Sequence, residues 1–161
     1  MILVVLGTHE LPFTRMLEEV ERCKKNGAIT DDIIVQLGHT PYQSDVMTLE
    51  KFVSYEEMDR LYDEARLILT HGGTGSIISG LKKDKKIIAA ARLKKYGEHN
   101  DDHQLELIDQ FVKANYILEW RENEPLEEVL RETRHFTPSP FQSGKENMIR
   151  LLRGFIEETQ K

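Results

Sequence analysis

A glycine-rich segment in the middle of the chain has the composition of an anion-binding loop. It lies between apolar runs at residues 67–69 and 77–78 and consists of His71, Gly72, Gly73, Thr74, Gly75 and Ser76. We interpret this order as strand, tight loop and helix, with glycines that permit positive φ angles and the close approach of a ligand. The free N–H groups at the start of a helix, together with the hydroxyls of Thr74 and Ser76, suit a phosphate group. The segment therefore predicts a diphosphate-binding site.

A simpler interpretation is that the glycines form a tight turn and that Ser76 caps a helix. The segment does not match the two best-known phosphate motifs. It lacks the Gly-Lys-Ser/Thr ending of a P-loop, and it follows a late strand, whereas the dinucleotide motif belongs to the first strand-to-helix turn. That first turn, at residues 7–12, lacks the second and third glycines and contains Glu10, which would repel a pyrophosphate. A dinucleotide-dependent enzyme is therefore disfavoured.

Two further polar segments follow predicted strands. One contains Gly7, Thr8 and His9, and the other contains Glu98, His99, Asn100, His103 and Gln104. Four of the six histidines, namely His9, His71, His99 and His103, lie in the three segments. His99 and His103 are four residues apart, but His99 lies in a predicted loop rather than on a helix, and no other pair has the i, i+4 or Cys-x-x-Cys spacing of metal sites, so we expect no metal. Hydrogen bonding to phosphate and sugar hydroxyls is the chemistry that these residues favour.

The elements that must position these residues alternate between strands and helices. Continuous apolar runs typical of buried parallel strands occur at residues 2–6, 33–35, 67–69, 87–91 and 116–118, with a short extended piece near 46–53. Apolar residues at helical spacing occur at 13–20, 58–65, 77–81, 105–112, 126–130 and 148–156. Ser54 and Ser143 begin capping boxes, and Pro125 occupies an expected first helical position. The pattern predicts an α/β fold, a Rossmann-like doubly wound parallel sheet, in which the three segments meet at the carboxyl ends of the strands.

Length and charge narrow the class of protein further. A chain of 161 residues is expected to form one domain over residues 1–161. The net charge of −6 argues against a nucleic acid partner, although basic residues gather at 82–86, which we interpret as a solvated helix end, and at 92–95, which could meet an anionic donor or lipid. The single cysteine, Cys23, indicates a reducing compartment. No stretch resembles a signal peptide or a membrane span, so we expect a soluble, cytoplasmic chain.

Three motifs in order, at residues 7–13, 71–76 and 103–107, resemble the C-terminal domain of family 28 glycosyltransferases. Within this family the chain resembles the PssE-like subunits of exopolysaccharide glycosyltransferases, and it is similar to the catalytic subunit of the dolichol-pathway UDP-GlcNAc transferase. The resemblance implies a single GT-B C-terminal half that binds a UDP-sugar donor without a metal or other cofactor. Because the first predicted strand begins at residue 2, we expect the acceptor-binding half to be a separate, membrane-anchored subunit. The implied activity is inverting transfer to a lipid-diphosphate-linked saccharide at the cytoplasmic face of the membrane.

The resemblance also implies roles for individual residues. The loop from His71 to Ser76 would contact the diphosphate and ribose, and His103 and Gln104 would face the donor sugar. Gly7, Thr8 and His9 would approach the reacting centre, with His9 as the candidate general base unless the partner subunit supplies it. Ser79 stands where relatives commonly have a ribose-binding glutamate, a contact that Glu98 could supply instead. His99 and Asn100 would contribute to the choice of donor.

Two alternatives remain open on the sequence. The chain could be a non-catalytic nucleotide-sugar-binding or regulatory subunit that keeps the fold of the enzyme. Residues 143–161 form a predicted C-terminal helix with an apolar stripe, which either packs on the same domain or docks to the membrane subunit.

Overall fold

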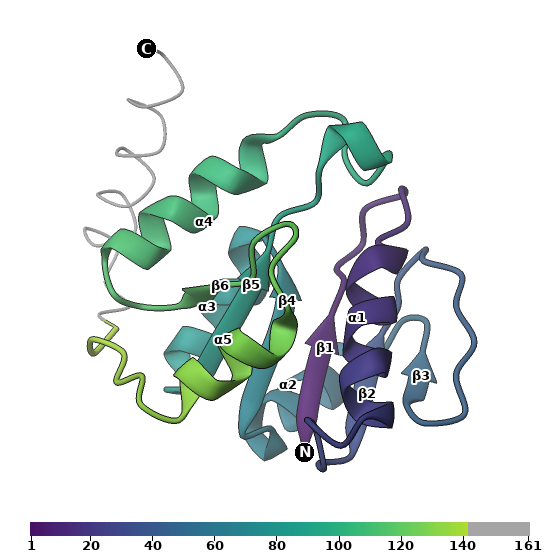
Figure 1. Cartoon of the computed structure of the whole chain (residues 1–161), viewed down its shortest axis with the longest axis horizontal. Coiled ribbons are helices and arrows are strands. Elements are labelled where there is room, and N and C mark those ends of the chain that lie inside the picture. The colour runs from purple at the N-terminus through teal and green to yellow at the C-terminus, as the bar shows by residue number, and fades with distance from the viewer. Residues whose placement is uncertain (142–161) are drawn as a thin grey trace.

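The computed structural model describes residues 1–141, so the predicted helix at 143–161 and its two possible roles lie outside the described residues. Six strands form one parallel sheet in the order β3-β2-β1-β4-β5-β6 (Figure 1). Their bounds are β1 (Ile2–Val5), β2 (Ile33–Gln36), β3 (Thr48–Glu50), β4 (Leu67–His71), β5 (Lys86–Ala90) and β6 (Leu118–Glu119). This is the order of a doubly wound sheet, as the alternation of elements predicts.

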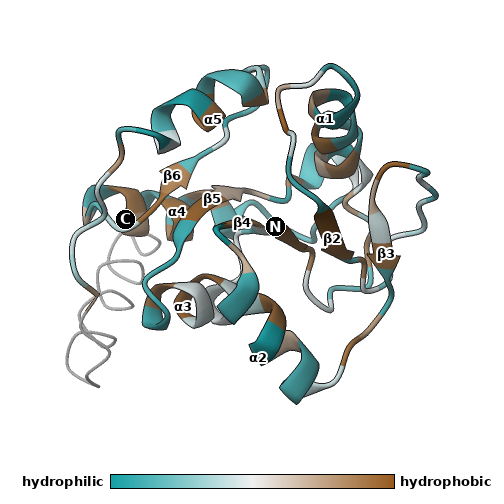
Figure 2. Ribbon diagram, turned by 90° about the horizontal axis from the view of Figure 1, so that it is seen from below, coloured by the Kyte–Doolittle hydropathy of each residue, from teal (hydrophilic) through white to brown (hydrophobic). Residues whose placement is uncertain are grey.

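Helices cover both faces of the sheet (Figure 2). On one face lie α1 (Thr14–Lys25) and α5 (Leu126–Thr133), and on the other lie α2 (Tyr55–Glu64), α3 (Thr74–Lys82) and α4 (His103–Lys113). A short 3₁₀ helix, η1 (Lys94–Tyr96), follows β5. None of the helices within residues 1–141 has the length and apolar composition needed to cross a membrane.

Strand β1 shows why the sheet is buried on both sides. Its side chains alternate, so that Ile2 and Val4 pack with α1 and α5 whereas Leu3 and Val5 pack with α2, α3 and α4. All four residues are at most 3% exposed. The continuous apolar run that predicts a strand is thus the consequence of two hydrophobic cores, one on each face.

Strands β2 and β3 lie on one side of β1, and β4, β5 and β6 lie on the other side, so the order of the strands reverses between β1 and β4. The candidate site lies at this point of reversal. Val5 is in register with Gln36 on one side and with Thr70 on the other, so the carboxyl ends of three strands stand level. The loops that follow β1 and β4 leave toward opposite faces of the sheet, and such a reversal opens a crevice for ligands.

The ends of helices and strands differ slightly from those that the sequence predicts. Ser54 caps α2 by accepting a hydrogen bond from the Glu57 N–H, which confirms the capping box. Pro125, expected at the first helical position, is instead the N-cap residue of α5. Strand β6 covers only Leu118–Glu119, whereas Tyr116 and Ile117, which the sequence included in this strand, are buried in the core ahead of it.

Candidate functional site

A cavity of about 480 Å³ lies at the carboxyl ends of β1 and β4. Its polar lining comes from the last residues of β2 and β4, from the loops after β1 and β4, and from α3, and includes Gly7, Thr8, Gln36, His71, Gly73, Gly75, Ser76 and Ser79. Its apolar wall comes from the segment between β3 and α2 and from α2 itself: Phe52, Val53, Tyr55, Met58 and Tyr62. The size is that of a small-molecule site, and the position is the one at which open α/β sheets bind ligands.

A larger hollow of about 690 Å³ lies elsewhere, between α1 and the start of α5. Its charge is net negative, because two arginines, Arg15 and Arg22, stand against five carboxylates: Glu18, Glu19, Glu122, Glu124 and Glu127. That negative charge is unsuited to an anionic ligand such as a diphosphate. The smaller cavity at the strand ends is therefore the candidate site.

His71 forms the floor of the cavity. It is the last residue of β4 rather than part of the loop, it is 8% exposed, and its ring is wedged between two glycines. A Cβ atom built on Gly7 would lie 2.4 Å from Nε2 of His71, and one built on Gly73 would lie 2.4 Å from Cε1. Burial, reinforced by the charge of Arg92 and by two neighbouring histidines, lowers the pKa of His71 to about 3, so the ring is neutral at pH 7.

The glycines of this segment serve a different purpose from the one the sequence suggested. Gly72, Gly73 and Gly75 do not adopt positive φ, so the expectation that these glycines use that freedom is wrong. Gly7, with a φ of +77°, is the residue at this site that does. What Gly72 and Gly73 provide is space, because side chains of His71 and Gln104 occupy the volume that a Cβ would need.

A matched pair of alanine substitutions should show whether a glycine here is needed for the space it leaves to a neighbouring side chain or for its backbone flexibility. Gly73→Ala should lower the free energy of unfolding by about 2 kcal/mol, because its Cβ collides with a buried ring. Gly75→Ala should be neutral or stabilising by up to about 1 kcal/mol, because that position is helical and has nothing within 4 Å. Urea unfolding of the two variants measures this, and equal losses would contradict the packing role of Gly73.

The N-terminus of α3 faces the cavity. No side chain in the described part of the chain caps this helix, and its first internal hydrogen bond runs from the Ile77 N–H to the Gly73 carbonyl. The N–H groups of the first turn are therefore available to an anion. Ser79 also lines the cavity and donates its hydroxyl to the Gly75 carbonyl at 2.8 Å, so its oxygen remains free to accept.

Gln104 does not face the cavity, although the sequence placed it at the donor sugar. It is buried behind His71, where its oxygen accepts from the Gly72 and Arg92 N–H groups, both at 3.0 Å. Its amide nitrogen lies 3.3 Å from Nδ1 of His71. The conclusion is that Gln104 joins α4 to the ends of β4 and β5.

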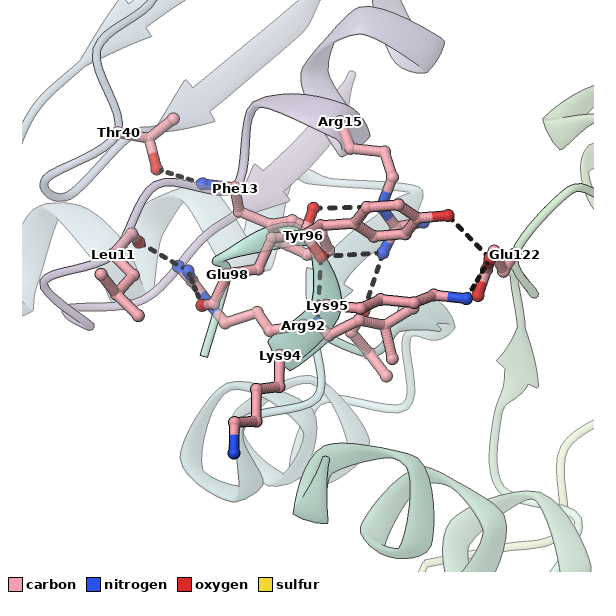
Figure 3. A network of polar contacts seen from close by, with 12 residues as sticks. Leu11, Phe13, Arg15, Thr40, Arg92, Lys94, Lys95, Tyr96, Glu98 and Glu122 are labelled. Carbon is pink, nitrogen blue, oxygen red and sulfur yellow. Dashed lines mark hydrogen bonds and ion pairs between the residues drawn. The ribbon is translucent and has the colours of Figure 1, made fainter. Parts of the chain in front are cut away.

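Arg92 and Glu98 are also internal (Figure 3). The Arg92 guanidinium donates to the carbonyls of Leu6, Leu11 and Glu98, so it is not part of a basic surface that meets a donor or lipid. The Glu98 carboxylate accepts two hydrogen bonds from Arg15 and one from the Leu93 N–H. This geometry does not support Glu98 as a replacement ribose ligand.

His9 stacks on His99, with ring centroids 4.3 Å apart. Its Nδ1 accepts a hydrogen bond from the Leu11 N–H at 3.1 Å. Burial, followed by the charges of His99 and Arg92, lowers the pKa of His9, which favours a neutral ring. Since the single lone pair of that ring is engaged at Nδ1, Nε2 carries the proton and presents a donor. His9 could act as a base only by giving up the Leu11 contact.

The remaining predicted residues lie on the segment that leads into α4. His103 begins that helix with a side chain that is 56% exposed and lies near Asp101 and Glu106. Asn100 is exposed. None of the five predicted residues between 98 and 104 is among those that line the cavity.

The apolar wall of the cavity, formed by residues 52–58, and the role of Gln36 were not predicted from the sequence. The side-chain amide of Gln36 clamps Gly7 by accepting from its N–H and donating to its carbonyl, both at 2.9 Å. Tyr55 is 84% exposed and Phe52 is 54% exposed at the cavity mouth. The sequence signal that could have found the wall is the pair of aromatic residues, Phe52 and Tyr55, beside the Ser54 cap.

Residues 1–141 contain no group of three or more histidine, cysteine, aspartate or glutamate side chains placed to hold a metal ion. The sheet order and the crevice at its reversal define an α/β domain that matches the C-terminal half of GT-B glycosyltransferases. The model of the glycosyltransferase family 28 C-terminal domain matches residues 1–158, and the chain belongs to this family.

Relatives of known name agree with this assignment. The chain is 38% identical over 61 residues to the UDP-N-acetylglucosamine transferase subunit ALG13 of Candida albicans, a match that covers 38% of this chain and 20% of that protein. It thus spans about a fifth of the length of this curated relative. The solution structure of ALG13 has a TM-score of 0.60 at 19% identity, covering 94% of this chain and 93% of that one. The glycotransferase of kitacinnamycin has a TM-score of 0.57 at 17% identity, covering 98% and 40%.

Proposed function

We propose that this chain is the donor-binding, catalytic subunit of a two-component inverting glycosyltransferase that uses a UDP-sugar. The observation that carries the proposal is the cavity at the carboxyl ends of β1 and β4. The uncapped N-terminus of α3 and the neutral ring of His71 both face this cavity, which has the size of a small-molecule site. Family membership supports glycosyl transfer. The name of the Candida relative supports UDP-N-acetylglucosamine as the first donor to test.

The cavity suggests how the donor would lie. The diphosphate would rest against the first turn of α3, near Gly73, Gly75 and Ser76, where backbone N–H groups and a hydroxyl can donate to it. The ribose would lie near the Ser79 oxygen. The base would pack on the wall of Phe52, Val53, Tyr55 and Met58, since nucleobases stack readily on aromatic side chains.

The same groups would serve the transfer step. As the acceptor oxygen attacks the anomeric carbon, the bond to the β-phosphate breaks and negative charge grows on the departing UDP. Donors already aimed at that phosphate stabilise this charge without reorganising. The acceptor hydroxyl must lose a proton, and His9 offers an N–H in the described geometry. We therefore favour a base on the acceptor-binding subunit over His9.

The partner in this proposal is a membrane-anchored subunit that carries the acceptor half. The supporting observations are that residues 1–141 form a single GT-B half and that the curated relative is named as a subunit. The acceptor would be a lipid-diphosphate-linked saccharide at the cytoplasmic face of a membrane, in exopolysaccharide or glycolipid synthesis. Because the lone pair of His9 is engaged by the Leu11 N–H, His9 does not act as a base in this geometry. This observation favours one alternative, a non-catalytic subunit that binds the nucleotide sugar.

Calorimetric titration with UDP and UMP tests the proposal. We expect UDP to bind at least about tenfold more tightly than UMP, because the β-phosphate adds charge-assisted hydrogen bonds at α3. Uridine serves as the control for contacts to the base and ribose alone. No binding of UDP at millimolar concentration, or equal affinity for UDP and UMP, would contradict the proposal.

A further inference from the structure

The orientation of the buried Gln104 amide is dictated by its neighbours. Two backbone N–H groups, those of Gly72 and Arg92, point at one of its terminal atoms, each at 3.0 Å. Only the amide oxygen can accept from both, because the amide nitrogen of glutamine is a donor. The NH₂ group must therefore face the other way, toward Nδ1 of His71 at 3.3 Å.

This orientation determines where His71 carries its proton. A nitrogen that faces an NH₂ donor must offer a lone pair, so Nδ1 of His71 is the acceptor. In a neutral imidazole the proton then resides on Nε2. The ring is neutral at pH 7, since burial holds its pKa far below that pH.

The Nε2–H group of His71 faces the cavity. Nε2 lies 3.4 Å from the Ser76 hydroxyl oxygen, and both residues line the cavity. Gly7 and Gly73 lie against the same edge of the ring, the one formed by Nε2 and Cε1. Backbone N–H groups, the Gln104 amide and the His71 imidazole thus form a chain of donors that ends at the cavity floor.

We propose that Gln104 is a positioning residue that locks His71 in the Nε2–H tautomer, so that the site offers the donor diphosphate a neutral N–H rather than a lone pair. This inference rests on the proposed function for the identity of the ligand, but not for the tautomer itself. It assigns Gln104 a role behind the site, in place of the sugar contact that the sequence suggested. A phosphate oxygen would meet a donor at every pH at which the protein is folded.

The tautomer can be read directly in the wild-type chain. We expect two-bond ¹H–¹⁵N correlation spectra at pH 7 to show His71 protonated at Nε2 and bare at Nδ1, with a His71→Asn spectrum assigning the resonance. Observation of the Nδ1–H form in the wild-type protein would overturn the proposal, whatever the variants do.

Gln104→Glu gives the complementary test. One carboxylate oxygen can still accept from the Gly72 and Arg92 N–H groups, but the other now requires a proton on Nδ1 of His71. The imidazolium form would still donate from Nε2, whereas the neutral form would turn a lone pair toward the phosphate. We therefore expect UDP affinity of the variant to fall about tenfold or more as the pH rises through the His71 transition, while wild-type affinity changes far less.

Gln110→Glu is the matched control, because it adds the same charge to the same helix at a partly exposed position. Its UDP binding should follow the wild-type pH profile. A Gln104→Glu variant that loses affinity equally at all pH values would show a merely structural role and overturn the proposal. Failure of the wild-type chain to bind UDP would instead contradict the proposed function, while the tautomer measurement still judges the role of Gln104.

Discussion

Replacing Arg92 with alanine is expected to lower the free energy of unfolding by about 4 kcal/mol. The side chain is 1% exposed, and its guanidinium is the shared donor for the carbonyls of Leu6, Leu11 and Glu98. Its loss would leave buried acceptors unpaired as well as a cavity. Burial lowers the pKa of Arg92 to about 10, so the group is still charged at pH 7 and its hydrogen bonds are charge-assisted.

The substitution should also loosen the site, because Leu6 and Leu11 bracket the loop that carries Gly7 and His9. Urea unfolding followed by circular dichroism measures the loss. Arg60→Ala is the control: its ion pairs with Glu57 and Glu64 are solvent-exposed, so its removal should cost far less stability. Similar losses for the two variants would show that the Arg92 hydrogen bonds do not hold the loop.

Acid should destabilise the protein through His71. The pKa of His71 is about 3 in the folded chain and near 6.5 in an unfolded one. Between these two values the unfolded state binds a proton at this residue and the folded state does not. Stability from this group is therefore complete above about pH 6.5 and falls as the pH drops toward 3. The expected loss is about 2 kcal/mol between about pH 7 and pH 5.

A His71→Asn variant isolates this contribution, because asparagine does not titrate and its side-chain oxygen can still accept from Gln104. The free energy of unfolding, measured by urea at several pH values, should decline less steeply for the variant than for the wild-type chain. The difference in slope belongs to His71, since all other titrating groups are common to both proteins. Parallel declines would mean that the ring is not held neutral by burial.

The fold could be predicted because its signals are local. Continuous apolar runs mark the strands, helical spacing marks the helices, and Ser54 caps α2 as its pattern predicts. The doubly wound parallel sheet is confirmed by the strand order and by the likeness to GT-B domains. The glycine segment was correctly placed between strand and helix, although its φ angles were not.

The interior of the site could not be predicted, because it depends on contacts between distant residues. Arg92 and Glu98 are polar side chains in a polar segment, and nothing in their spacing shows that Arg92 reaches back to Leu6 or that Arg15 pairs with Glu98. Gln104 lies in the first turn of a helix, in a motif that resembles a sugar-binding one. Its burial behind His71 follows from how α4 packs, which is a property of the whole fold.

The most direct test of the account is a UDP titration of ¹⁵N-labelled protein followed by amide chemical shifts. We expect saturable shifts at Gly7 and Thr8 and from Gly73, the N-cap of α3, to Ser76 in its first turn, with smaller changes at the aromatic wall around Tyr55. The N–H groups around the acidic hollow at Glu122 and Glu127 should not respond. No shifts at millimolar UDP, or shifts centred on that hollow, would contradict the claim that the sheet reversal is a donor site.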